Sequence, residues 1–157
     1  MKWQEWFDRW SMKSLKISAG FASMQFAPHD QDRDAAWELY VELLTRITVQ
    51  PLAENEGDEA TALESIHSLF PLTREIIRKY GRHGNDFAKL AIIVLNQIIR
   101  PFTARWHLAS LQGAFKDEKR CKIFRKELAD LQMLLIRYTQ MLGEMAAVED
   151  WTKLQAE

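Results

Sequence analysis

The chain has 157 residues, which fits one domain, and 47% hydrophobic with 27% charged residues is the composition of a globular protein. The 6 glycines and 4 prolines are too few for a collagen-like or disordered chain. The single cysteine excludes an internal disulfide framework and a cysteine-based zinc site. A net charge of −1 argues against general attraction of the whole molecule to polyanions.

Targeting signals are the next feature that the sequence informs. The first ten residues carry charges throughout and contain no apolar region of the kind found in secretory signals. The longest apolar run, residues 90–95, is short compared with the roughly 20 residues of a membrane span. We therefore expect a cytoplasmic protein without a membrane partner, and one free thiol, Cys121, suits a reducing compartment.

Residues 1–28 form an N-terminal unit that begins with an aromatic face. Four aromatic side chains share one side of a short predicted helix, at the spacing of partner-binding anchors: Trp3, Trp6, Phe7 and Trp10. They either pack on the other helices as a lid, dock into a partner as binding residues, or lie on a membrane surface. Residues 11–28 alternate weakly and predict a short hairpin or an extended arm.

Residues 29–157 show helical periodicity almost throughout. The first predicted helix takes Asp32 or Asp34 as its N-cap and ends before Pro51. Acidic residues 54–58, which include a glycine, then predict a loop.

Two further apolar stripes predict the central helices. The stripe over residues 63–80 contains Pro71, which must kink the helix or split it, because proline lacks the N–H and crowds the preceding turn. Asn85 or Asp86 is expected to cap the next helix. Its residues 89–99 are apolar on nearly every side, which predicts burial among neighbouring helices.

The last helix has the clearest pattern. Pro101 is expected to break or restart the third helix, and Gly113 to end it, before Asp117 caps the fourth. Apolar residues then alternate four and three apart at Phe124, Leu128, Leu131, Leu135, Tyr138, Leu142 and Met145. We predict an all-α antiparallel four-helix bundle, with the N-terminal unit as an appendage.

Charge is segregated along the chain, since residues 73–126 are basic and both flanks are acidic. One basic cluster ends the second helix, where positive charge suits the helix dipole. The other begins the fourth helix, where the dipole disfavours it: Lys116, Lys119, Arg120, Lys122, Arg125 and Lys126. Either acidic residues of 34–72 neutralise these charges across the bundle, or the basic segment docks an acidic partner or nucleic acid.

Two arginine–histidine pairs carry the one enzyme-like spacing in the chain: Arg78 with His83, and Arg100 with His107. The spacing resembles that of helical HEPN ribonucleases. The resemblance implies an acid–base histidine, a phosphate-orienting arginine and a dimeric, metal-independent ribonuclease or toxin. In that family a characteristic polar residue follows the arginine, whereas here Lys79 and Pro101 occupy this position. Ordinary structural roles for the two arginine–histidine pairs are therefore the alternative.

Motifs for other chemistry fall short of their requirements. Glu64 and His67 form half of a di-iron signature, and no second copy follows. The aspartates of residues 30–34 lack the glycine and glutamate of a calcium loop. Cys121 lies between basic residues but has no base placed to activate it. We expect neither a metal site nor a cofactor.

Polar and aromatic residues near the third helix have the chemistry of an interface. Asn96 and Gln97 interrupt its apolar run and need hydrogen-bond partners. Arg105 and Trp106 belong to the residue types enriched at protein interfaces, so we include them as candidate partner-binding residues, with a kinked core helix as the alternative.

Two stretches, AAWELYVELLTRI and VLNQIIRPFTARWH, resemble those of small all-helical accessory proteins of bacterial defence loci. The resemblance covers about residues 30–110 and transfers no functional residue. Our leading interpretation is a non-enzymatic helical interaction protein, an accessory or regulatory subunit that binds a protein partner or forms a homo-oligomer. The alternative is the HEPN-like ribonuclease.

Overall fold

The computed structural model describes residues 1–53 and 58–154, and over these residues the protein is all-α. This confirms the prediction of an all-α protein. Within the same ranges no strand forms, and a single antiparallel bridge joins Lys2 to Gln25. Residues 11–28 thus form an extended arm that contains one short helix and no hairpin. Most of the loop predicted at 54–58 lies outside the described residues, but Asp58 is placed and caps a helix.

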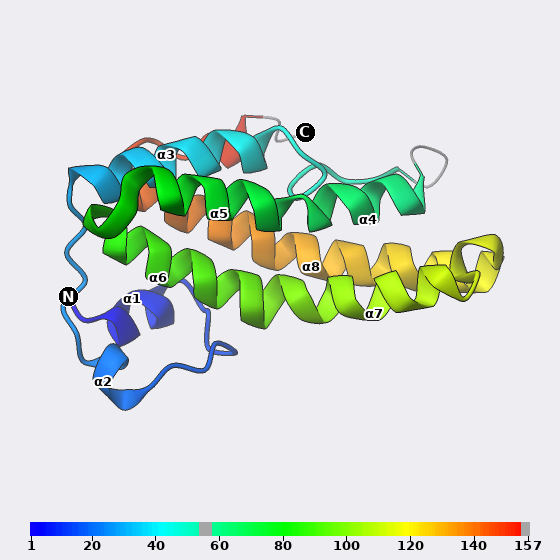
Figure 1. The fold of residues 1–157 in the computed structure, drawn as a ribbon, viewed down its shortest axis with the longest axis horizontal. Helices are drawn as coiled ribbons and strands as arrows, with labels where there is room; N and C mark the ends of the chain where they lie inside the picture. Colours follow the sequence, from blue (N-terminus) through cyan, green and yellow to red (C-terminus); the bar gives the residue numbers. More distant parts are fainter. Residues whose placement is uncertain (54–57, 155–157) are drawn as a thin grey trace.

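The longer helices lie along one long axis, and the two short N-terminal helices lie to one side (Figure 1). Their bounds are α1 Trp3–Arg9, α2 Ala19–Ala22, α3 Asp30–Leu44, α4 Glu59–His67, α5 Leu69–Tyr80, α6 Asn85–Val94, α7 Arg100–Leu111 and α8 Glu118–Met145. Figure 1 shows α4 and α5 in one row, α6 and α7 in a second row, and α8 along both. The predicted stripe of α8 faces the core, since all seven of its residues are buried.

Pro71 splits the second predicted helix, as expected. Ser68 ends α4 and also precedes the first residue of α5, so the break lies three residues before the proline. Pro71 then occupies the first turn of α5, where a missing N–H is tolerated. The two helices continue in nearly one row, with α4 beside α7 and α5 beside α6.

The third predicted helix continues through Pro101 instead of breaking there. A π-turn, Leu95–Ile99, joins α6 to α7, and the Arg100 N–H bonds to the carbonyl oxygen of Leu95. The π-turn inserts one residue, and Pro101 follows it in the first turn of α7, where its missing N–H is tolerated. The inserted residue rotates everything after it by about 100° around the helix axis.

Two predicted caps are wrong by a few residues. His29 is the N-cap of α3, and Asp32 is the third helical residue, whose carboxylate accepts the His29 N–H at 2.9 Å. Gly84, the last residue of a 3-10 turn, is the N-cap of α6. Asp117 does cap α8, because its carboxylate accepts the Lys119 N–H at 3.0 Å.

The N-terminal unit packs on the longer helices. Trp3 and Trp6 are fully buried, and the Trp6 ring stacks on Phe26 with ring centroids 4.1 Å apart. Gln97, in the π-turn, exchanges two hydrogen bonds of 2.7 Å with the backbone of Lys16 in the arm. Asp86 of α6 and Glu144 of α8 also accept hydrogen bonds from the first 28 residues, so the unit is attached to the π-turn, α6 and α8.

Candidate functional site

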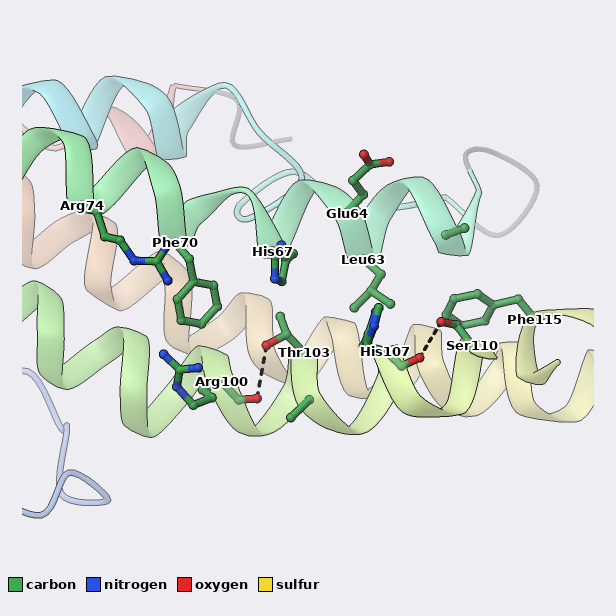
Figure 2. Close-up of a pocket in the computed structure, with 12 residues that line it drawn as sticks. Leu63, Glu64, His67, Phe70, Arg74, Arg100, Thr103, His107, Ser110 and Phe115 are labelled. Atoms are coloured by element: carbon green, nitrogen blue, oxygen red, sulfur yellow. Dashed lines mark hydrogen bonds between the residues drawn. The ribbon is translucent and has the colours of Figure 1, made fainter. Parts of the chain in front are cut away.

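A groove of about 460 Å³ lies between α4–α5 and α7, and we call it the α4–α7 groove (Figure 2). Small-molecule sites commonly have volumes in this range. Its lining combines apolar, aromatic and basic side chains: Ala60, Leu63, Glu64, His67, Phe70, Arg74, Arg100, Thr103, Ala104, His107, Ser110 and Phe115. Helical spacing explains the lining of α7, since residues 100, 103, 107 and 110 share one face.

Two arginines form the cationic end of the groove. The guanidinium carbon of Arg100 lies 4.7 Å from the centroid of the Phe70 ring, and that of Arg74 lies 5.8 Å from the same centroid. Asn96 Oδ1 accepts the Arg100 Nε–H at 3.3 Å. Within residues 1–53 and 58–154, neither arginine forms an ion pair with a carboxylate.

Two histidines occupy the middle of the groove from opposite walls. Figure 2 shows His67 directed from α4 toward α7, and His107 directed from α7 toward α4. The His67 ring lies 5.7 Å from Phe70. The Ser110 hydroxyl donates to the His107 carbonyl oxygen at 2.7 Å, so it serves the helix backbone. The groove thus carries two imidazoles beside its two guanidinium groups.

The opposite end of the groove is apolar. Leu63 points into it from α4, and Phe115 closes it from the turn between α7 and α8. Glu64 also lines the groove, and Figure 2 shows its carboxylate directed away from α7. The groove is therefore polarised, with charge at one end and hydrocarbon at the other.

The structure separates the two predicted arginine–histidine pairs. Arg100 and His107 both line the α4–α7 groove. Arg78 lines a smaller adjoining pocket of about 270 Å³, together with Arg74 and Arg100, whereas His83 lies in the exposed 3-10 turn after α5. Only the second pair is brought to one site.

The predicted docking residues at the N-terminus are mostly internal. Trp3, Trp6 and Phe7 are buried inside the same chain, which agrees with the packing alternative. Trp10 is half-buried, and its Nε1–H donates to Glu144 Oε2 at 2.6 Å. The aromatic face therefore docks within the chain, through the same physics that would dock it on a partner.

Trp106 is likewise part of the core. It is 2% exposed, and its Nε1–H donates to Glu127 Oε2 at 2.6 Å. Arg105 pairs with the other oxygen of Glu127 at 2.5 Å while most of its side chain stays exposed. The predicted interface residue Trp106 is thus a buried ring, and Arg105 is a surface residue with an internal partner.

One member of the basic patch predicted at the start of α8 forms an ion pair within the chain. Arg125 pairs with Glu59 at 3.1 Å and donates to the Ala53 carbonyl oxygen at 2.9 Å. Arg120 is partly exposed, and the remaining members of the patch are exposed: Lys116, Lys119, Lys122 and Lys126. Neutralisation by the acidic segment therefore holds for Arg125, and for Lys79, which pairs with Glu38 at 2.5 Å.

Cys121 and the acidic residues do not assemble a reactive centre. The Cys121 thiol donates to the Phe115 carbonyl oxygen at 3.3 Å, and burial together with nearby Glu59 raises the thiol pKa. A raised pKa disfavours the reactive thiolate. Among the residues that the structure describes, no group of three or more histidine, cysteine and acidic side chains is arranged to hold a metal ion.

Membrane-spanning potential is limited to one stretch of the described chain. The stretch Glu59–Leu111, which contains α4 to α7, has an 18-residue window apolar enough to cross a membrane by length and composition. That window is 44% buried, and the core helix of a soluble protein passes the same criterion, so the indication is weak.

Sequence reasoning missed the grouping of Arg74 with Arg100 and of His67 with His107. Their signal was present, since residues 67, 70 and 74 have the spacing of one helix face. Which two helix faces meet is decided by tertiary packing.

Comparison of the chain with protein-family models, curated proteins and solved structures finds no match.

Proposed function

We propose that the protein is a helical interaction protein that binds an anionic ligand or partner in the α4–α7 groove, and that it serves as an accessory or regulatory subunit of a larger assembly. The observation that carries the proposal is the pair Arg74 and Arg100. Both lie in a groove and lack carboxylate partners among the described residues, whereas Arg46, Arg105 and Arg125 pair within the chain.

The scaffold suits this role. We take α3, α4–α5, α6–α7 and α8 as the four members of an antiparallel bundle, in which a groove between two rows is held by rigid helices. A cytoplasmic location suits the unpaired Cys121, because free thiols persist in reducing compartments. The resemblance to accessory proteins of bacterial defence loci also favours a subunit over a free-standing enzyme.

Affinity capture from native cells tests the proposal, with protein and nucleic acid both identified. The double variant Arg74→Ala/Arg100→Ala is compared with wild type, and Lys13→Ala/Arg82→Ala is the matched control because it removes equal charge from exposed positions outside the groove. We expect a partner that the groove variant loses and the control retains. Capture that is unchanged in the groove variant contradicts the proposal.

A second candidate is a metal-independent ribonuclease of the HEPN kind, favoured by the presence of Arg100 and His107 in one groove. The chain carries an internal control, since His83 belongs to the other pair and lies outside the groove. RNA cleavage that His107→Ala abolishes and His83→Ala preserves supports this candidate. Absence of cleavage by the wild type, alone and with a captured partner, removes it.

A further inference from the structure

We propose that the ligand of the α4–α7 groove is a nucleotide, with its phosphate at Arg74 and Arg100 and its base between the two imidazoles and the apolar end. The inference rests on the proposed function and names the class of anion. Three features of the groove carry it: an uncompensated guanidinium pair, a middle lined by rings, and walls made only of helices.

The guanidinium pair favours a phosphate. Arg74 from α5 and Arg100 from α7 are both exposed and lie against the same Phe70 ring, which brings two like charges near each other. An anion between them relieves the repulsion and takes up free N–H donors of both groups. Guanidinium groups match the geometry of phosphate oxygens and bond them in bidentate fashion.

The middle of the groove favours a planar, aromatic body. His67 and His107 approach it from opposite walls, and Phe115 lies beyond them. Bases stack on histidine and phenylalanine rings in proteins that recognise nucleotides. On α7, Arg100 and His107 are two turns apart, or about 10 Å at 1.5 Å per residue. This separation suits the phosphate-to-base span of one nucleotide.

The walls disfavour an extended acidic peptide. Strand addition, one mode by which extended peptides bind, needs an exposed sheet edge. Here both walls are helices, whose interior backbone groups bond within the helix, and the groove hydroxyls of Thr103 and Ser110 donate to carbonyl oxygens of α7. The groove can therefore recognise a ligand only through charged side chains and aromatic rings. A nucleotide offers a phosphate to the former and a base to the latter.

Asn96 is the positioning residue of the site. Its side-chain oxygen Oδ1 accepts the Arg100 Nε–H at 3.3 Å. This hydrogen bond leaves the two terminal nitrogens of Arg100 for a ligand. The π-turn that holds Asn96 also sets the rotation of α7, and thereby the direction of the face that Arg100 and His107 share.

Isothermal titration calorimetry tests the inference on the full chain, with adenosine 5′-monophosphate as the probe. We expect binding of the monophosphate, weaker binding of inorganic phosphate and none of adenosine. Arg100→Ala is expected to weaken binding about tenfold or more, the loss of a charged hydrogen bond. Arg74→Ala is expected to weaken binding by a similar factor, and Asn96→Ala by a smaller one. Arg82→Ala, which removes an exposed charge outside the groove, is the control and should bind as wild type. Circular dichroism of each variant establishes that it folds.

Further binding measurements distinguish failure of this inference from failure of the proposed function. A glutamate-rich peptide that binds in an Arg74- and Arg100-dependent way, without nucleotide binding, overturns the nucleotide and leaves the anion-binding function standing. Adenosine binding as tightly as its monophosphate, or binding insensitive to Arg100→Ala, also overturns the inference. A short RNA that binds more tightly than the free monophosphate, with the same arginine dependence, identifies the nucleotide as a unit of RNA. Equal affinities identify a free nucleotide.

Discussion

Asp32 Oδ1 accepts the backbone N–H of Phe87 at 2.9 Å, across 55 positions of sequence. The other oxygen of Asp32 accepts the His29 N–H. One carboxylate, 1% exposed, therefore satisfies backbone donors at the start of both α3 and α6. Helix starts leave such donors without intrahelical partners, so the aspartate joins two helices that the chain connects only through α4 and α5.

Asp32→Ala is predicted to destabilise the protein by about 2–3 kcal/mol, because it leaves two backbone donors unpaired, one of them buried. Urea unfolding followed by circular dichroism measures this change. Asp34→Ala is the matched control, since Asp34 is an exposed residue of the same helix. We expect the control to fall within about 0.5 kcal/mol of wild type. Equal stabilities of the two variants would show that the shared cap contributes nothing.

Glu144 is the residue that attaches α1 to α8. Its carboxylate accepts the indole N–H groups of Trp6, at 3.2 Å, and Trp10, at 2.6 Å, and pairs with Arg9. Glu144→Ala leaves the buried Trp6 N–H without this partner, at a cost of about 1–3 kcal/mol. We predict faster amide hydrogen exchange in α1 while α3 keeps its protection.

The control for this variant is Asp130→Ala, which removes an exposed carboxylate from the same helix α8. Unchanged exchange of α1 in Glu144→Ala would mean that ring packing alone holds the aromatic helix in place.

Gln97 is predicted to hold the arm. Its amide exchanges two hydrogen bonds with the backbone N–H and carbonyl oxygen of Lys16, so Gln97→Ala should free both groups. We expect the Lys16 amide to exchange about tenfold faster or more, which corresponds to about 1.5 kcal/mol. The neighbouring variant Asn96→Ala is the control, because Asn96 bonds Arg100 and does not contact the arm through a hydrogen bond. Similar exchange in both variants contradicts the assignment.

The fold class and the interior of the long helices were predictable from local pattern. The stripe of α8 and the split near Pro71 follow from spacing and from the missing N–H of proline, both of which act within a few residues. The N-caps of α3 and α6 were harder to predict from the sequence. His29 and Gly84 precede helices whose first turns are stabilised by Asp32, a residue that serves α6 only after folding.

The candidate site was predictable only in part. Arg100 and His107 were recognisable as a pair at helical spacing, but their opposite wall is α4–α5, and no local signal specifies that pairing. The aromatic face of α1 had the opposite problem. Its amphipathic pattern was clear, yet the pattern is the same whether Trp3 and Trp6 bury themselves on their own chain or on another protein.

Gly143 marks a close approach of α8 to α3. A Cβ atom at this position would lie 3.0 Å from Cε2 of the Tyr40 ring. The ring is held in place, since its hydroxyl donates to the Glu149 carbonyl oxygen at 3.0 Å and accepts the Trp151 N–H at 2.6 Å. We predict that Gly143→Ala is destabilising by about 1–3 kcal/mol, because overpacking exceeds the gain of about 1 kcal/mol in helix propensity.

Gly20→Ala serves as the matched control, since no atom lies within 4 Å of the Cβ that would be added there. Thermal unfolding should show a lower melting temperature for Gly143→Ala and no loss for Gly20→Ala. A stabilised Gly143→Ala would mean that Tyr40 shifts readily despite its two hydrogen bonds.

Glu38 is predicted to make stability depend on acid pH. Hydrogen bonds donated by Lys79 and Tyr80, the latter 2.6 Å long, lower the pKa of the Glu38 carboxyl below its ordinary value of 4.5. The folded state then holds this proton less tightly than the unfolded state. Its contribution is present above pH 4.5 and is lost as the pH falls through the folded pKa. Glu38→Gln should therefore lower the melting temperature at neutral pH and show less decline toward acid than wild type. Parallel pH profiles of the two proteins would rule out a stabilising role for the ionised carboxylate.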